Sequence, residues 1–205
     1  FTTEQERQLS SKSYWLYNAN EKVMGYGTFD PPSDIERQRR IFLQSFSNLR
    51  GKRFFLFLSR IHPKKGLDIL IDAFASVVSE DPSLHLVIAG PDQLGMVKSL
   101  RSHAVELGID DRITWAGMLT GDLKWGAFRC AELFCFPSRQ ENFGVVVAEA
   151  LACGLPVAIS EPVNISIEVA NSNAGLVFND SVVATQHALY QWLHFTKAQK
   201  SVMRE

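Results

Sequence analysis

Several features that mark common classes of protein are missing from this sequence. Its apolar runs fall short of the roughly 20 residues that span a bilayer, so we expect no transmembrane segment. The 21 basic and 22 acidic residues leave a formal net charge of -1, which argues against a protein that binds nucleic acid through a broad basic surface. The three cysteines lack any Cys-x-x-Cys spacing, which favours buried thiols in a reducing, cytoplasmic setting.

Signatures of metal and dinucleotide binding are also missing. The five histidines have no spacing typical of metal ligands, and no Asp-x-Asp triplet is present to hold a divalent cation on a nucleotide diphosphate. Gly-x-Gly-x-x-Gly does not follow the first expected strand, which counts against a dinucleotide-binding oxidoreductase. We therefore expect neither a bound metal nor a cofactor.

The chain does contain short apolar runs that alternate with amphipathic segments. The expected strands are 54–58, 85–89, 113–116, 133–136, 157–160 and 176–178, and the expected helices between and after them are 67–79, 96–107, 122–130, 145–153, 167–170 and 182–195. Because the strands lack polar alternation and are separated by helices, they predict a parallel sheet buried on both faces. The fold class is therefore α/β, a Rossmann-like domain over residues 51–205.

The first 50 residues differ in character from the rest. Residues 10–34 are rich in turn-forming residues and predict an irregular connector, whereas 35–49 predict a helix. No Met precedes Phe1, and the sequence stops within a polar helical stretch at 200–205. We expect the chain to be a piece of a longer protein.

Residues 137–150 (PSRQENFGVVVAEA) place two carboxylates, Glu141 and Glu149, eight residues apart around a glycine loop that opens a helix. Gly144 permits close approach of the backbone to a ligand, and the free N–H groups at the helix start form an anion site. Glu149 has almost only apolar neighbours in sequence, so it needs a polar partner. The alternative interpretation of Glu141 is an acid favoured by the helix dipole alone.

Arg60 and Lys65, five residues apart in the loop after the first strand, have the charge needed to neutralise a diphosphate. The alternative is a pair of solvated surface cations, and Lys64 has the same charge as Lys65. In parallel sheets, ligands bind beyond the carboxyl ends of the strands. The loops at 59–66, 90–92, 117–119, 138–144 and 161–164 are therefore expected to form one cleft.

These motifs resemble a known family. Glu141 to Glu149 is similar to the Glu-x7-Glu motif of retaining glycosyltransferases with the GT-B fold, in the family 4 that includes sucrose and mannosyl transferases. Residues 59–66 (SRIHPKKG) resemble its Gly-Arg-x-x-x-x-Lys-Gly segment, and residues 148–157 (AEALACGLPV) resemble its Glu-Ala-x-Ala-Cys-Gly-x-Pro-Val segment. The resemblance covers most of residues 54–180.

The resemblance implies that residues 51–205 are the C-terminal, donor-binding domain of a GT-B enzyme. Residues 1–50 would then be the end of the acceptor domain, a linker and a leading helix, with the N-terminal acceptor domain itself absent. The residues implied in donor binding are Arg60, Lys65, Gly90, Gly117, Met118, Ser138, Glu141, Asn142, Phe143, Gly144, Val145 and Glu149. Of these, Glu141, Arg60 and Lys65 are expected to be catalytic.

The implied reaction is metal-independent transfer of a hexose, with retention, from a nucleotide diphosphate sugar to an acceptor held by the other domain. The fragment alone is expected to be inactive, and peripheral membrane association of a full-length protein is compatible with the resemblance. Two alternatives stay open: a module that binds a nucleotide sugar or phosphorylated ligand without turnover, and a GT-B-like epimerase or phosphorylase. The motifs specify no base, sugar or acceptor.

Overall fold

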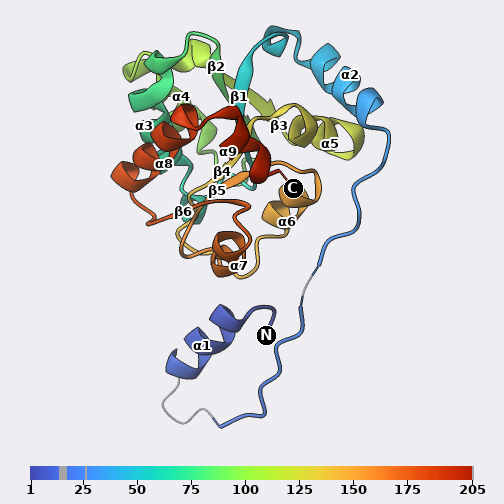
Figure 1. The fold of residues 1–205 in the computed structure, drawn as a ribbon. Coiled ribbons are helices and arrows are strands. Elements are labelled where there is room, and N and C mark those ends of the chain that lie inside the picture. Colours follow the sequence, from blue (N-terminus) through green and yellow to red (C-terminus); the bar gives the residue numbers. More distant parts are fainter. Residues whose placement is uncertain (14–17, 26, 205) are drawn as a thin grey trace.

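The computed structural model describes residues 1–13, 18–25 and 27–204, and its centre is a six-stranded parallel sheet (Figure 1). The strands are β1 (Arg53–Leu58), β2 (Leu84–Ala89), β3 (Ile113–Gly117), β4 (Leu133–Phe136), β5 (Val157–Ser160) and β6 (Gly175–Phe178). Each lies within one residue of its predicted position. All the pairings between neighbouring strands are parallel, so the predicted α/β class is confirmed.

The helices are α1 (Glu4–Ser13), α2 (Ile35–Ser45), α3 (Leu67–Val77), α4 (Val97–Glu106), α5 (Gly121–Cys130), α6 (Val145–Ala152), α7 (Ser166–Asn171), α8 (Val182–His194) and α9 (Lys197–Val202). Figure 1 shows α3, α4 and α8 on one side of the sheet and α2, α5 and α6 on the other. The two faces are therefore both covered, as the uninterrupted apolar strands predict. No helix in the described part of the chain has the length and hydrophobicity to cross a membrane.

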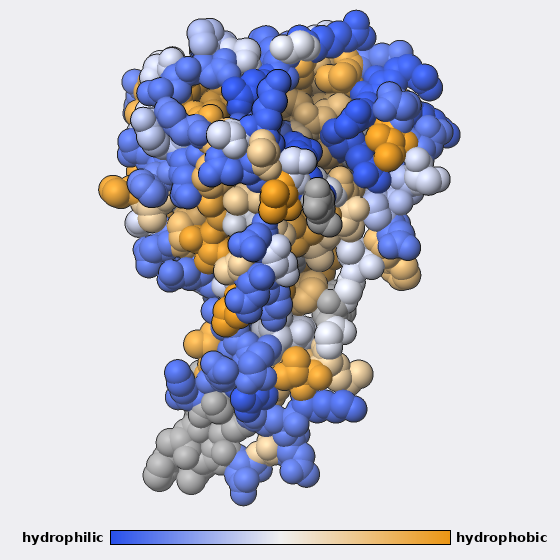
Figure 2. All heavy atoms as spheres, in the orientation of Figure 1, coloured by the Kyte–Doolittle hydropathy of each residue, from blue (hydrophilic) through white to orange (hydrophobic). Residues whose placement is uncertain are grey.

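The core forms where the apolar strands meet these helices. Residues 54–57 of β1 and all of β2 are buried, and aromatic rings stack across neighbouring strands, with the Phe57 and Phe136 centroids 6.1 Å apart. Figure 2 shows that hydrophilic side chains cover most of the visible outer face. Burial of this many aromatic and aliphatic side chains is the main source of stability of such a domain.

The helices expected at 35–49 and 67–79 end earlier than predicted, and helix α1 was not predicted. The helix expected at 35–49 ends at Ser45, because Phe46 leaves helical geometry (φ -122°, ψ 64°) before a 3-10 turn at Ser47–Leu49. The helix expected at 67–79 ends at Val77 and continues as a 3-10 turn, Val78–Glu80. Helix α1 falls in the part expected to be the end of another domain and the start of an irregular connector.

The rest of the connector has the predicted character. Residues 18–25 and 27–34 contain neither helix nor strand, and in Figure 1 they run as an extended segment from α1 to α2. Positions 14–17 and 26 of the predicted connector lie outside the described residues. At the other end, α9 includes only 200–202 of the polar helical stretch expected at 200–205, and residues 203 and 204 form a turn. The helix begins with a capping box between Thr196 and Gln199.

The sheet order β3-β2-β1-β4-β5-β6 creates a switch point between β1 and β4. The chain leaves these two neighbouring strands in opposite directions, and a crevice forms beyond their carboxyl ends. The loops after β1 and β4 touch at Gly66, whose φ is +66° and where a Cβ would lie 1.9 Å from the carbonyl oxygen of Pro137. Only glycine permits this contact, so Gly66 fixes the width of the crevice.

Candidate functional site

Every residue predicted to bind the donor lies at the carboxyl edge of the sheet. Arg60 and Lys65 are in the loop after β1, and Gly90 is in the loop after β2. Gly117 ends β3 and Met118 follows it, while residues 138–144 are in the loop after β4. Glu149 is in α6, which begins directly after the β4 loop. The structure therefore brings together residues that are up to 89 positions apart in the sequence, from Arg60 to Glu149.

One half of this edge is a cavity of about 390 Å³. Its lining residues are Leu58, Ser59, Arg60, Gly90, Pro91, Met118, Leu119, Thr120, Gly121 and Lys124. Gly90 has a φ of +140°, and a Cβ there would lie 1.7 Å from the carbonyl oxygen of Ser59, so a side chain would clash with backbone. The cavity wall is made largely of backbone and small side chains, which allows a flat group to approach closely.

Arg60 supplies an uncompensated positive charge to this cavity. Its side chain is exposed and has neither an ion-pair nor a hydrogen-bond partner among the described residues. Met118 on the opposite loop is 68% exposed and adds an apolar surface. The cavity therefore combines a free guanidinium with an apolar wall, a combination that suits an anionic ligand with a flat ring.

Lys65 and Glu141 form an ion pair at the switch point. The Nζ of Lys65 lies 2.6 Å from Oε2 of Glu141, and the lysine is only 8% exposed. Its ammonium also lies 5.6 Å from the centre of the Phe136 ring. The predicted cation and the predicted carboxylate therefore contact each other directly.

The loop that carries Glu141 is anchored to the loop after β5. The N–H of Glu141 donates to the carbonyl of Pro162 at 3.2 Å, and the N–H of Asn164 donates to the carbonyl of Glu141 at 3.0 Å. These two bonds extend the sheet ladder by one isolated parallel bridge. Glu141 is therefore held by its backbone on one side and by Lys65 on the other, which fixes the carboxylate in the crevice.

Glu149 has the polar partner that its apolar neighbours predict. Its Oε1 lies 2.6 Å from Nζ of Lys124, and both side chains are mostly buried. Lys124 also lies 4.8 Å from the centre of the Trp125 ring. Lys124 was not predicted from the sequence, although a cation in the first turn of a helix that begins at this edge is a signal that could have found it.

Helix α6 begins without a side-chain cap. Gly144, with a φ of +82°, occupies the N-cap position, and no side chain accepts from the first N–H groups of the helix. Asn142 and Val145 on either side are exposed, and Phe143 is half-buried. The first N–H groups of α6 are therefore available as hydrogen-bond donors, and the anion site expected at this position stays a prediction.

The hydroxyl group of Ser138 forms hydrogen bonds within the protein. The residue is fully buried, and its Oγ lies 2.9 Å from the carbonyl oxygen of Lys64 and 3.0 Å from that of Gln140. Arg139 beside it donates to both oxygens of Asp68, at 2.9 and 2.6 Å. These contacts connect the β1 and β4 loops, so in the described structure Ser138 positions the loops that carry the charged residues.

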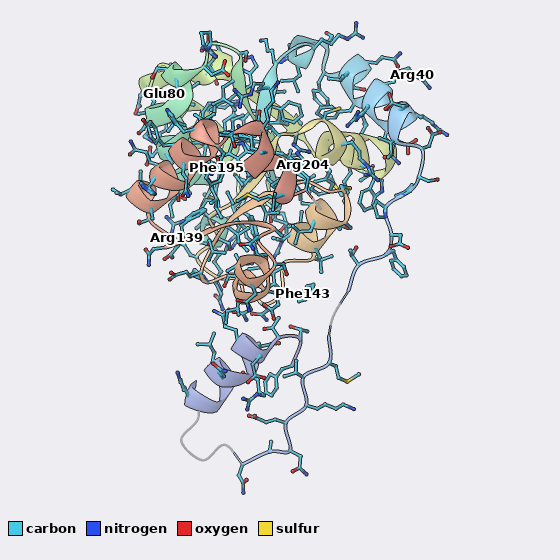
Figure 3. All side chains as sticks on the ribbon, in the orientation of Figure 1. Arg40, Glu80, Arg139, Phe143, Phe195 and Arg204 are labelled. Atoms are coloured by element: carbon cyan, nitrogen blue, oxygen red, sulfur yellow. The ribbon has the colours of Figure 1, made fainter. Side chains whose placement is uncertain are left out.

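A second hollow of about 380 Å³ lies between this edge and α1. Its lining residues are Glu6, Leu9, Ser10, Arg139, Gln140, Glu141, Asn142, Pro162 and Asn164. The Nε2 of Gln5 in α1 donates to the carbonyl of Glu161 at 3.2 Å. Figure 3 shows Arg139 and Phe143 on the side of the body that faces α1, and Glu80 and Arg40 on the far side. Glu141 therefore faces a hollow on this side of the crevice.

Neither the cysteines of α5 and β4 nor the two acids before β3 belong to this site. Burial raises the pKa of the Cys130 thiol to about 11 and that of the Cys135 thiol further, so neither is a nucleophile at neutral pH. Asp110 and Asp111 form a 3-10 turn before β3, at the opposite edge of the sheet. Among residues 1–13, 18–25 and 27–204, no three His, Cys, Asp or Glu side chains form a group that could hold a metal ion.

A family model described as "Glycosyl transferases group 1" matches residues 39–203 of this sequence. The chain belongs to this family of GT-B glycosyltransferases. It is 31% identical over 193 residues to the D-inositol 3-phosphate glycosyltransferase of Thermomonospora curvata, a match that covers 87% of this chain and 44% of that protein. The chain spans less than half the length of the first curated relatives it matches.

Solved structures show the same fold for this glycosyltransferase domain. It is similar to a sucrose-phosphate synthase from Thermosynechococcus elongatus, with a TM-score of 0.81 and 22% identity over all of this chain and 50% of that one. It is also similar to Anabaena HepE in complex with UDP, with a TM-score of 0.76, 23% identity, and coverage of 89% of this chain and 50% of that one. The domain is one Rossmann-like half of a GT-B fold.

Proposed function

We propose that this glycosyltransferase domain binds the donor, a nucleotide diphosphate sugar, and supports transfer of its hexose to an acceptor with retention of configuration. The observation that carries the proposal is the arrangement of Arg60, Lys65 and the uncapped start of α6 around one crevice. These are three sources of positive charge that converge from different loops. The complex of the similar Anabaena HepE with UDP gives independent support for a nucleoside diphosphate.

The charge arrangement suits the chemistry of a departing diphosphate. When the bond between the sugar and the diphosphate breaks, negative charge grows on the phosphate oxygens. Arg60, Lys65 and the N–H groups at the start of α6 would stabilise that charge more in the transition state than in the ground state. Because these groups supply the positive charge themselves, we propose that transfer needs no divalent metal.

The two glutamates would contact the neutral parts of the donor. Glu149 lies just over one turn into α6, beside the cavity that contains Arg60, and its carboxylate would accept hydrogen bonds from ribose hydroxyls. Glu141, at the other end of the crevice, would accept from the hydroxyls of the sugar and orient it. The backbone of Gly90, Gly117 and Met118 would face the base.

The acceptor would be bound by a second domain. The relatives that this chain matches are more than twice as long as the matched part, and a GT-B enzyme closes two domains around the donor. We therefore propose that this chain binds donor but needs an acceptor-binding half for transfer. A cytoplasmic reaction, with the enzyme at most peripherally associated with a membrane, fits the same proposal.

Calorimetric titration of the chain with UDP, GDP and ADP, and with a sugar conjugate of each, tests the proposal. We expect one nucleoside diphosphate to bind, with affinity lost in both Arg60→Ala and Glu149→Ala. Thermal unfolding of each variant shows whether it remains folded. If no nucleotide binds to the folded chain, the donor site proposed here is wrong.

A further inference from the structure

Lys65 has little access to water, whereas Glu141 lines the hollow beside α1. Lys65 is 8% exposed and the side chain of Glu141 is 23% exposed, with 2.6 Å between their charged atoms. Phe136 covers the ammonium group from the side of the sheet. The Lys65 ammonium therefore cannot exchange its partner for bulk water at small cost, and a ligand that binds Lys65 deprives the Glu141 carboxylate of its cationic partner.

A diphosphate that binds Lys65 competes with Glu141 for the same ammonium group. The carboxylate stays close to the site, because the backbone of Glu141 is hydrogen-bonded to Pro162 and Asn164. It is then a partly buried negative charge beside an anion, with weakened attraction from Lys65. This arrangement opposes binding unless another donor of hydrogen bonds reaches the carboxylate.

The sugar is the part of the donor that has such hydrogen-bond donors. A nucleotide diphosphate sugar brings hydroxyl groups that can bond to the carboxylate, whereas the spent nucleoside diphosphate has none at that position. We infer that the Lys65–Glu141 pair distinguishes loaded donor from spent diphosphate, and that Glu141 promotes release of the product. This inference rests on the proposed function and assigns Glu141 a role beyond orienting the sugar.

The second pair in the site provides a matched comparison. Glu149 pairs with Lys124 at the same distance of 2.6 Å, but it lies beside the cavity proposed for the nucleoside. Ribose hydroxyls are present in both the loaded and the spent donor. Loss of the Glu149 charge must therefore change the affinity for both ligands by similar factors, whereas loss of the Glu141 charge must not.

The test is a set of titrations of the 205-residue chain and three variants, Glu141→Gln, Glu149→Gln and Glu80→Gln. Each is titrated with UDP and UDP-glucose, GDP and GDP-mannose, and ADP and ADP-glucose, and the pair that binds the wild-type chain most tightly is analysed. Glu80→Gln makes the same change in net charge at an exposed position on the far side (Figure 3). Glutamine keeps the shape of the glutamate side chain and one acceptor oxygen. Circular dichroism verifies that each variant is folded.

We expect Glu141→Gln to tighten binding of the bare diphosphate by about tenfold and to change binding of the sugar conjugate by less than about threefold. Glu149→Gln is expected to weaken both ligands by similar factors, and Glu80→Gln to change neither. Equal effects of Glu141→Gln on both ligands, or weaker binding of the diphosphate, would overturn this inference while the donor site stands. Absence of binding to the folded wild-type chain would overturn the proposed function as well.

Discussion

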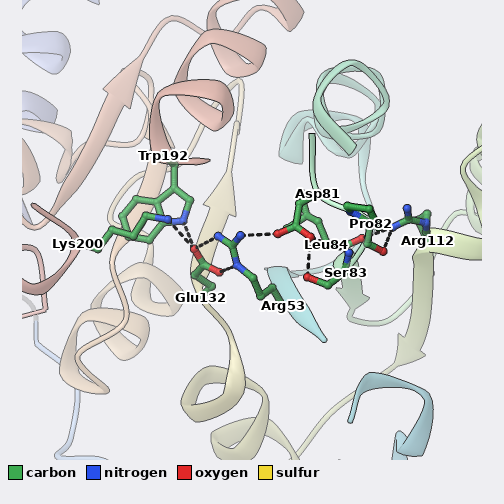
Figure 4. Close-up of polar contacts among 9 residues, drawn as sticks. All are labelled: Arg53, Asp81, Pro82, Ser83, Leu84, Arg112, Glu132, Trp192 and Lys200. Atoms are coloured by element: carbon green, nitrogen blue, oxygen red, sulfur yellow. Dashed lines mark hydrogen bonds and ion pairs between the residues drawn. The ribbon is translucent and has the colours of Figure 1, made fainter. Parts of the chain in front are cut away.

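The two edges of the sheet use charge in different ways. At the amino edge, the carboxylate of Glu132 accepts hydrogen bonds from Arg53, Lys200 and Trp192, and Arg53 also pairs with Asp81 (Figure 4). Glu132 and Arg53 each have more than one partner there, and these come from distant parts of the chain. At the carboxyl edge, charges occur in single pairs, Arg60 has no partner among the described residues, and α6 begins uncapped.

The charges at the amino edge stabilise the domain, whereas those at the carboxyl edge are available to bind a ligand. A carboxylate with four protein donors has no capacity left for a ligand, so the Glu132 cluster (Arg53, Asp81, Glu132, Trp192 and Lys200) connects β1, β4, α8 and α9 and stabilises the domain. The single pairs at the other edge leave oxygen and N–H groups that a ligand can use. Substitutions at the amino edge should therefore mainly lower the free energy of unfolding, whereas substitutions at the carboxyl edge should mainly change ligand binding.

The largest effect is expected at the amino edge. Glu132→Ala leaves Arg53 and Lys200, which is 17% exposed, without their main acceptor, and it also removes the partner of the Trp192 indole. We expect the free energy of unfolding to fall by about 3 kcal/mol, because breaking a largely buried ion-pair cluster leaves unpaired charge. Urea unfolding followed by circular dichroism measures this loss. Unchanged stability would mean that the cluster is not structural.

Arg60→Ala is the matched change at the carboxyl edge. We expect binding of the preferred nucleoside diphosphate to weaken by about 30-fold, since a charge-assisted hydrogen bond contributes about 2 kcal/mol. The free energy of unfolding should change by less than about 0.5 kcal/mol, because the side chain is exposed and unpaired. Arg40→Ala, an exposed arginine on the far side (Figure 3), should affect neither quantity. Full affinity in Arg60→Ala would remove this residue from the site.

A smaller effect tests whether the single pairs also contribute to stability. Lys124→Met leaves the Glu149 carboxylate, whose side chain is 14% exposed, without its cation. We expect a loss of about 1 kcal/mol in the free energy of unfolding, and partial recovery in the double variant Lys124→Met/Glu149→Gln. Urea unfolding of the four proteins of this cycle provides the coupling energy. A coupling energy of zero would mean that the pair does not stabilise the free domain.

The smallest expected effect is a pH dependence that originates at the amino edge. Burial alone would raise the pKa of Glu132, but the hydrogen bonds from Arg53 and Lys200 outweigh it and hold the pKa below the ordinary value of 4.5. A carboxyl group with a lowered pKa in the folded state stabilises the protein above its unfolded pKa and loses that effect as pH falls. Stability should therefore decrease from about pH 4.5 downward, and less steeply in Glu132→Gln. An equally steep decrease in both proteins would assign the effect to other carboxyl groups.

The sequence predicts much of the fold because the apolar strands are short, buried and bounded by turn residues. All six strands lie within one residue of the positions predicted from such runs. The helix ends were predicted less well at Ser45 and Val77, where 3-10 turns continue the helical hydrophobic pattern. Helix α1 was missed because its polar sequence has no apolar periodicity.

The candidate site was predicted as a set of residues but not as a set of contacts. Glu141, Glu149, Arg60 and Lys65 were all assigned to one cleft, because loops after parallel strands converge. Their pairing was not predicted, since Lys65 and Glu141 are 76 positions apart and Lys124 and Glu149 are 25 apart. The Glu132 cluster had no local signal either, because Arg53 and Lys200 come from strands and helices that only the tertiary fold brings together.

Hydrogen exchange of backbone amides, measured with and without the nucleoside diphosphate that binds best, tests most directly whether the carboxyl edge is the binding edge. The account predicts slower exchange in the presence of ligand at residues 59–66, 90–92, 117–121 and 141–148, which include the first turn of α6. It predicts no change at residues 52–54, 81–85 or 131–133, where the amino-edge clusters lie. Protection that appears at the amino edge, or binding that protects no amide at the start of α6, would contradict it.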